Sequence, residues 1–160
     1  IEGNMKFTQK NLNYWCKNKA LFERNGLNFI PAFHRVQIAE NDTYSLDPTR
    51  KATNCRLVSV EGKNFVSMNE PYQGMFIMDK QLVKEHLESS YFPFGHKHSY
   101  GIRESANLGN IYVNVPEGYP HRAALPLNNL EACMVEHFGT DYHNDPNSPH
   151  AKIKIENLFV

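Results

Sequence analysis

The chain has 160 residues, and its 17 basic and 17 acidic residues give a formal net charge of zero. With 41% hydrophobic, 12% aromatic and 21% charged residues, its composition is that of a folded globular chain. The balanced charge argues against nucleic acid and anionic membranes as main partners, and no apolar run approaches the roughly 18 residues that span a bilayer.

The first half of the chain predicts one helix followed by strands. Thr8 is placed to cap a helix over residues 8–24, in which apolar residues recur at helical spacing before Gly26. Strands are predicted over residues 28–39, 56–60 and 64–67. The last two strands flank Glu61-Gly62-Lys63, a sequence typical of a hairpin turn.

The second half predicts further strands and shorter helices. Residues 74–78 are apolar enough for a buried strand, and Asp79 is placed to cap the helix that follows. A short helix is predicted over residues 102–108, and strands over 111–115 and 132–137. Because helices and strands mix without strict alternation, we expect the α/β class, with a mixed sheet flanked by helices.

The first candidate metal cluster combines His96-Lys97-His98 with Glu104 and His121. Imidazoles two residues apart on a strand point to the same side, where a carboxylate and a third imidazole can complete a transition-metal site. This pattern resembles the metal motif of a cupin barrel, which implies a metal-dependent oxidoreductase or isomerase. The alternative is a set of solvated histidines in a loop between Gly95 and Gly101.

A second cluster of metal-binding residue types begins at the end of the predicted strand over residues 132–137. Its members are His137, Asp141, His143, Asp145 and His150. Since α/β sheets bind ligands at the carboxyl ends of their strands, His137 is the member with a functional interpretation. For the others the alternative is a plain turn-rich loop, because Asn, Asp and Pro favour turns.

Two further segments carry candidate binding groups. Glu104 stands at the start of the predicted helix over residues 102–108, where the helix dipole keeps a carboxylate ionised and suited to act as a base. Tyr72 and Gln73 precede Gly74, and they offer a stacking face and an amide to a polar ring such as a sugar. The alternatives are a Glu that stabilises a helix and a strand entry without a ligand.

Six segments, taken in order along nearly the whole chain, resemble the C-terminal half of a glycosyltransferase of the A fold, which uses a nucleotide-sugar donor. The segments are Glu2-Gly3-Asn4, residues 8–15, Ala32-Phe33-His34-Arg35, residues 71–75, Gly101-Ile102-Arg103-Glu104 and Val135-Glu136-His137. The resemblance implies transfer of a sugar to a hydroxyl of a carbohydrate or glycan acceptor. It also implies Mn²⁺ or Mg²⁺, which would neutralise the departing diphosphate.

The resemblance assigns a role to each of these positions. It implies metal ligands at Glu2, Asn4 and His137, and a catalytic base at Glu104. It implies substrate-binding residues at Arg35, Tyr72, Gln73, Gly74 and Arg103.

This chain departs from the resemblance at the acidic triplet, because Glu2-Gly3-Asn4 retains one carboxylate where the family has three. The departure implies weak metal affinity, an inactive copy or a metal-independent variant. Because the chain begins with Ile1 at that triplet, we expect residues 1–160 to be a single domain or a domain fragment without the N-terminal nucleotide-binding half. The alternative function is a non-catalytic carbohydrate-binding or interaction domain, and the compartment stays open between cytoplasm and Golgi lumen.

Overall fold

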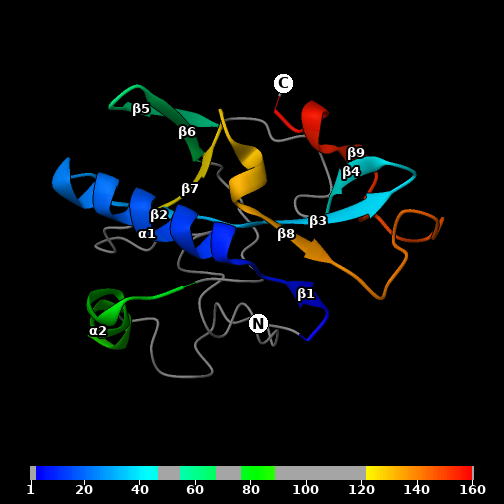
Figure 1. Ribbon diagram of the computed structural model, residues 1–160, viewed down its shortest axis with the longest axis horizontal. Coiled ribbons are helices and arrows are strands. Elements are labelled where there is room, and N and C mark those ends of the chain that lie inside the picture. Colours follow the sequence, from blue (N-terminus) through cyan, green and yellow to red (C-terminus); the bar gives the residue numbers. More distant parts are fainter. Residues whose placement is uncertain (1–2, 47–54, 68–76, 89–121, 160) are drawn as a thin grey trace.

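The computed structural model describes residues 3–46, 55–67, 77–88 and 122–159, which Figure 1 draws in colour. These residues form two mixed β-sheets and a few helices, which confirms the α/β class in its coarse form. They do not show the finer arrangement of a glycosyltransferase-A fold. Among them, no helix is long and apolar enough to cross a bilayer.

The first sheet contains five strands in the order β1-β8-β3-β4-β9. Its strands are β1 (Met5–Lys6), β8 (Met134–His137), β3 (His34–Ala39), β4 (Asp42–Ser45) and β9 (Ile153–Lys154). β3 and β8 are parallel, and the other neighbouring pairs are antiparallel. The sheet therefore places the end of β8 beside β1, close to the N-terminal end of the described chain.

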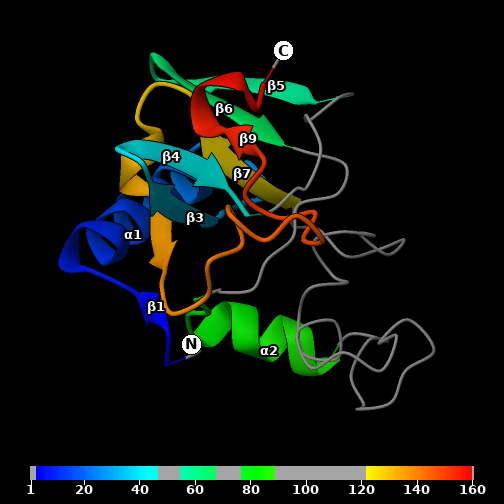
Figure 2. The same ribbon diagram turned by 90° about the vertical axis from the view of Figure 1, so that its right-hand side faces the viewer.

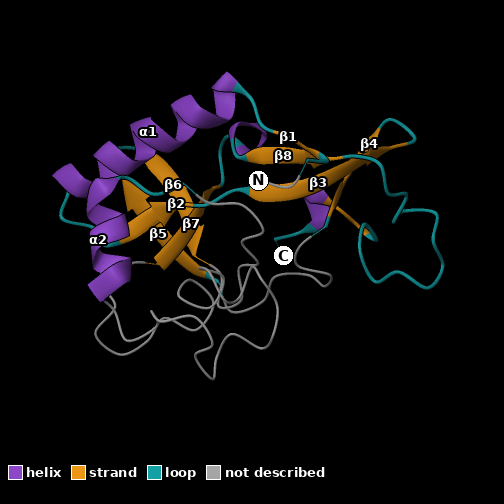
Figure 3. Ribbon diagram, turned by 90° about the horizontal axis from the view of Figure 1, so that it is seen from below, coloured by secondary structure: helices purple, strands orange, loops and turns teal. Residues whose placement is uncertain are grey.

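The second sheet contains four strands in the order β2-β7-β6-β5. Its strands are β2 (Phe29–Pro31), β7 (Arg122–Pro126), β6 (Lys63–Ser67) and β5 (Arg56–Val60). β2 and β7 are parallel, and the others pair antiparallel. The helical elements are α1 (Gln9–Arg24), α2 (Lys80–Glu88), η2 (Leu130–Ala132) and η3 (Ile155–Asn157). Figure 3 shows the two sheets side by side with α1 along the second, and Figure 2 shows α2 on the side away from the β5–β6 hairpin.

Several predicted elements are confirmed. Thr8 caps α1 through a capping box, and Gly26, with φ of +63°, follows the end of the helix. The Oδ1 atom of Asp79 accepts the N–H of Leu82 at 2.8 Å, so Asp79 caps α2 as predicted. The β5–β6 hairpin turns at Glu61 and Gly62, whose positive φ values are those of the turn type that suits twisted strands.

The predicted strand over residues 28–39 is instead two strands in different sheets. β2 ends at Pro31. The N–H of Ala32 bonds to Ala124 in β7, but the N–H of His34 bonds to Cys133 just before β8. The chain thus leaves one sheet and enters the other around the proline.

Other predicted strands also differ from the structure. The strand expected over residues 132–137 begins with the last residue of η2 and becomes β8 only at Met134. No strand is predicted where β4 and β7 form, and residues 77 and 78 are not in a strand although one is predicted over 74–78. β4 follows a turn at Glu40 and Asn41 that contains no glycine, so the usual hairpin signal is missing. The elements predicted over residues 102–108 and 111–115 lie outside the described residues.

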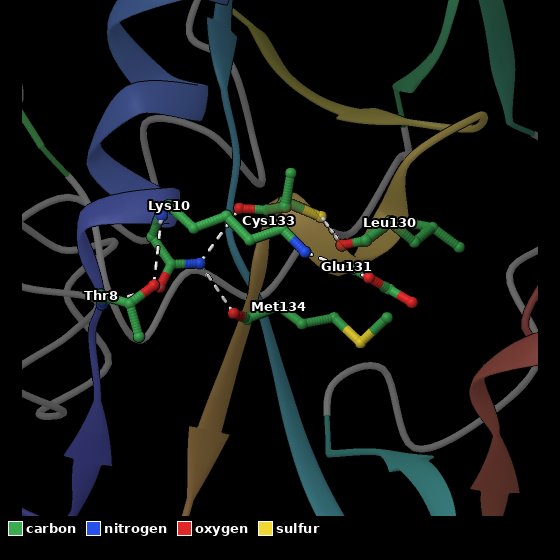
Figure 4. Close-up of polar contacts among 8 residues, drawn as sticks. Thr8, Lys10, Leu130, Glu131, Cys133 and Met134 are labelled. Atoms are coloured by element: carbon green, nitrogen blue, oxygen red, sulfur yellow. Dashed lines mark hydrogen bonds and ion pairs between the residues drawn. The ribbon is translucent and has the colours of Figure 1, made fainter.

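The N-terminal end of α1 is held to the start of β8 by the buried side chain of Asn11. Its Oδ1 atom accepts the backbone N–H and the hydroxyl of Thr8 at 2.9 and 2.7 Å. Its Nδ2 group donates to the carbonyls of Ala132 and Met134 at 3.0 and 2.8 Å. An exposed ion pair between Lys10 and Glu131 lies beside this junction (Figure 4).

The other end of α1 is held by the turn of the β5–β6 hairpin. Arg24 forms two bonds with the Glu61 carboxylate, of 2.8 and 2.5 Å, and Asn25 adds a third of 2.8 Å. These bonds lower the pKa of Glu61 to about 2. Between the two ends, Nζ of the buried Lys19 lies 3.4 Å from Oδ2 of Asp79. Asp79, which caps α2, therefore also connects α2 to α1 through this ion pair.

The core lies under α1, where the two sheets meet. Tyr14 is buried there, and its hydroxyl donates to the carbonyls of Ala32 at 3.0 Å and Ala124 at 3.4 Å. Burial raises the pKa of Tyr14 well above its usual value, so this hydroxyl stays protonated and keeps donating. The Phe33 ring packs edge-on against Tyr14. The crossing of the chain between the sheets is therefore covered by one aromatic side chain of α1.

We predict that Asn11→Ala lowers the free energy of unfolding by about 3 kcal/mol, because it leaves the carbonyls of Ala132 and Met134 without their donor and breaks the capping box. Urea unfolding at pH 7 measures the change. Asn13→Ala is the matched control, because Asn13 is exposed on the same helix. Equal losses in the two variants would contradict the role given to Asn11.

Stability should fall in mild acid because of His34. Burial, together with the nearby Arg35 charge, lowers the pKa of His34 from 6.5 to about 4. Between these values the unfolded chain binds a proton that the folded chain rejects, so stability is complete above pH 6.5, falls with pH and levels off below about 4. Between pH 7 and 4, wild type should lose about 3 kcal/mol more than His34→Gln. Urea unfolding at each pH measures the free energy of unfolding of both proteins. If wild type and His34→Gln lose the same amount between pH 7 and 4, His34 is not the cause.

Candidate functional site

Asn4 and His137, which lie 133 residues apart in the sequence, meet at the edge of the first sheet. The pairing of β1 with β8 sets Met5 opposite His137, and the N–H of Phe138 bonds to the carbonyl of Asn4 at 2.9 Å. The Nδ2 atom of Asn4 lies 2.8 Å from Nε2 of His137. Two of the three residues that the sequence predicts as metal ligands are therefore in direct contact.

In this contact the amide nitrogen of Asn4 is the donor and Nε2 of His137 is the acceptor. His137 is 4% exposed, whereas Asn4 is half-buried.

Arg35, a predicted substrate-binding residue, lies on the same face of the first sheet as His137. Arg35 in β3 is paired with Val135 in β8, and paired residues of neighbouring strands share a face. Val135 and His137 are two residues apart and so share that face as well. Val135 is fully buried in the core, while Arg35 is half-buried. The face thus runs from the core toward the Asn4–His137 contact.

The remaining predicted site residues lie outside the described residues. They are the predicted ligand Glu2, the predicted base Glu104, and the predicted substrate-binding residues Tyr72, Gln73, Gly74 and Arg103. The cluster of His96, His98 and His121 lies outside them too. Of the predicted site residues, the structure describes Asn4, Arg35 and His137.

The loop after β8 does not bring its acidic and histidine residues into one metal group. Nδ1 of His143 donates to the carbonyl of Ala151 at 3.1 Å, and Nδ1 of His150 donates to that of Leu46 at 2.9 Å. The Asp141 carboxylate accepts bonds from Gln37 and Asn144, which lower its pKa. Within the described parts of the chain, no group of three or more His, Cys, Asp or Glu side chains could hold a metal ion.

Sequence reasoning missed two residues that support His137. The ring of Tyr142 lies 5.6 Å from that of His137 and 5.4 Å from that of His150, measured between ring centroids. The Lys152 ammonium donates to the carbonyls of Tyr142 at 3.0 Å, His143 at 2.6 Å and Asp145 at 2.9 Å. Lys152 thus closes the loop that sets Tyr142 against His137. No local sequence pattern predicts that a lysine will bind backbone carbonyls.

Asn4 and His137 offer a cation one amide oxygen and one imidazole nitrogen, both of which Mn²⁺ accepts. Both groups are neutral, so the pair needs a carboxylate to balance a divalent charge. Glu2, two residues before Asn4, is the carboxylate nearest to Asn4 in the sequence. In the structure, however, the nitrogen of the Asn4 amide faces His137, and the described residues contain no group of three or more metal-binding side chains.

Comparisons with models of protein families, with curated proteins and with solved structures found no match to this chain.

We predict that Asn4 and His137 are energetically coupled. A double-mutant cycle with Asn4→Ala, His137→Ala and the double variant should give a coupling energy of about 1 kcal/mol, the net value of one hydrogen bond. Urea unfolding of the four proteins supplies the numbers. If the losses of unfolding free energy in the two single variants add up to the loss in the double variant, the contact contributes nothing to stability.

Proposed function

We propose that this chain is the acceptor-side part of a glycosyltransferase-like domain that transfers a sugar from a nucleotide-sugar donor to a hydroxyl of a carbohydrate acceptor. The observation that carries the proposal is the 2.8 Å contact between Asn4 and His137. The family resemblance assigns both residues to the metal site although they stand near opposite ends of the chain. A chance likeness of short motifs would give no reason for these two side chains to touch.

The position of Arg35 adds support. The proposal needs a cationic group beside the metal site to face the phosphates of the donor, and a guanidinium binds phosphate oxygens in a planar, two-bond geometry. Arg35 shares a sheet face with His137 and is half-buried rather than fully solvated. Its strand is the direct neighbour of β8. This arrangement suits a donor whose diphosphate lies on this face between Arg35, at the start of β3, and His137, at the end of β8.

In the proposed site, Asn4, His137 and Glu2 would hold Mn²⁺ or Mg²⁺. The cation would supply charge neutralisation for the departing nucleoside diphosphate. Tyr142 and Lys152 would keep the His137 ring in place from the side of the loop. Glu104 would take the proton of the acceptor hydroxyl, and Arg103, Tyr72, Gln73 and Gly74 would line the sugar sites.

Mn²⁺ binding, followed by the loss of the electron paramagnetic resonance signal of the free ion, tests the proposal. The titration is run without nucleotide and with UDP or GDP, which represent the leaving group whatever the sugar. We expect saturable Mn²⁺ binding that His137→Ala weakens by roughly tenfold or more, because the variant removes a ligand. His143→Ala is the matched control, since His143 donates to a loop carbonyl and does not contact Asn4.

An unchanged Mn²⁺ signal in the presence of the wild-type chain would overturn the metal-dependent proposal. Equal weakening by His137→Ala and His143→Ala would do the same, because it would reflect loosening of the loop rather than loss of a ligand. A nucleotide that binds equally well with and without Mn²⁺ would favour the metal-independent variant of the same transferase.

The second candidate function is a non-catalytic carbohydrate-binding domain. It is favoured by the sequence Glu2-Gly3-Asn4, which leaves one carboxylate at the proposed metal site, and by the neutral chemistry of the Asn4–His137 pair. Such a domain would bind glycans without nucleotide and without metal. The same titrations therefore separate the two functions.

A further inference from the structure

A pocket of about 170 Å³ lies between α1, the start of β6 and the turn after β7, and neither Asn4 nor His137 lines it. In Figure 1 these elements lie to one side of β1 and β8, whose ends carry the proposed metal site. Carbon atoms make up most of the pocket surface, but five of the eight lining residues have amide or ammonium groups. They are Asn18, Lys63, Asn64, Asn128 and Asn129.

Asn18 carries the most deeply buried amide of this pocket, with 7% of its surface exposed. Asparagine is a poor helix former, and a buried amide is costly unless its groups are bonded. Its Nδ2 group donates to the carbonyl of Tyr14 at 2.9 Å. Among the described residues, its Oδ1 atom has one partner, the Lys63 ammonium, at a long 3.4 Å. This carbonyl oxygen is therefore an acceptor that a ligand hydroxyl can engage more closely.

The mouth of the pocket presents further amides. The Oδ1 atom of Asn64 accepts the hydroxyl of Ser59 at 2.7 Å, which orients its amide. Asn128 and Asn129 are exposed, and the structure gives their side chains no hydrogen bond within the described residues. A carboxamide offers a donor and an acceptor side by side, which matches two neighbouring hydroxyls of a sugar ring.

The pocket also has an apolar surface and a defined size. Tyr14, Phe65 and Pro126 supply carbon surface against which the C–H face of a sugar can pack. Its volume is below the roughly 300 Å³ at which sites for drug-sized ligands begin, so it suits one ring rather than a chain. Among the described residues no carboxylate lines it, and the ammonium of Lys63 disfavours a cation there.

We propose that this pocket is a binding site for one neutral pyranose unit of a glycan. The inference does not depend on the proposed transferase activity or on a metal, because none of its residues belongs to the Asn4–His137 site. In a transferase the pocket would hold a glycan at a distance from the reacting hydroxyl. In a non-catalytic domain it would be a site of glycan recognition in its own right.

Titration with methyl glycosides of glucose, galactose and N-acetylglucosamine, followed by ¹⁵N NMR of the whole chain in EDTA, tests the proposal. We expect at least one glycoside to shift the side-chain amide signals of Asn18, Asn64, Asn128 or Asn129 saturably, with a dissociation constant on the order of 1 mM. EDTA removes any contribution of the proposed metal site, so failure of the transferase proposal and failure of this one can be distinguished.

Two exposed substitutions and one matched control sharpen the test. Lys63→Ala and Asn129→Ala should each weaken binding roughly tenfold, because each removes a hydrogen-bonding group from the pocket. Asn13→Ala removes an exposed amide from α1 that does not line the pocket, and it should leave the affinity unchanged. Absence of saturable shifts up to roughly 50 mM of every glycoside, or equal affinities in all the variants, would overturn the proposal.

Discussion

The side chain of Asn11 joins two distant parts of the chain, and the geometry of the Asn4–His137 site depends on it. Its oxygen completes the capping box at the start of α1, and its nitrogen holds two carbonyls at the start of β8. β1 and Asn4 precede this junction in the sequence, and His137 follows it at the far end of β8. Because one buried amide satisfies four polar groups, it sets the position of β1 and α1 relative to β8.

Hydrogen bonds from α1 also hold the two sheets in a fixed position relative to each other. The segments that contain β2–β3 and β7–β8 run parallel through both sheets, so each sheet is continued by the other. Tyr14 covers the crossing and bonds to one carbonyl from each segment. Since both ends of α1 are bonded as well, to β8 through Asn11 and to the β5–β6 turn through Arg24, the helix fixes the sheets together.

Local signals in the sequence predicted the elements that local chemistry decides. The capping residues Thr8 and Asp79 and the turn at Glu61-Gly62 act within a few residues of themselves, so their effect can be recognised without the fold. The break at Pro31 was missed, because alternation of side chains continues across it while its hydrogen bonds change partner. β7 was missed because Pro-rich sequence surrounds it, although its buried Ala123, Ala124 and Leu125 mark it as a core strand in the structure.

By itself, the sequence determined the α/β composition, both described α-helices and the choice of Asn4, Arg35 and His137 as residues of interest. Whether these residues meet depends on the pairing of β1 and β3 with β8, and such long-range pairings leave no mark in a local pattern. Tertiary structure alone brought Asn4 to His137, set Tyr142 against the His137 ring and gathered the amides around Asn18 into a pocket. The physical reason is that backbone carbonyls and buried amides must find partners, and those partners are chosen by the packed fold rather than by neighbours in sequence.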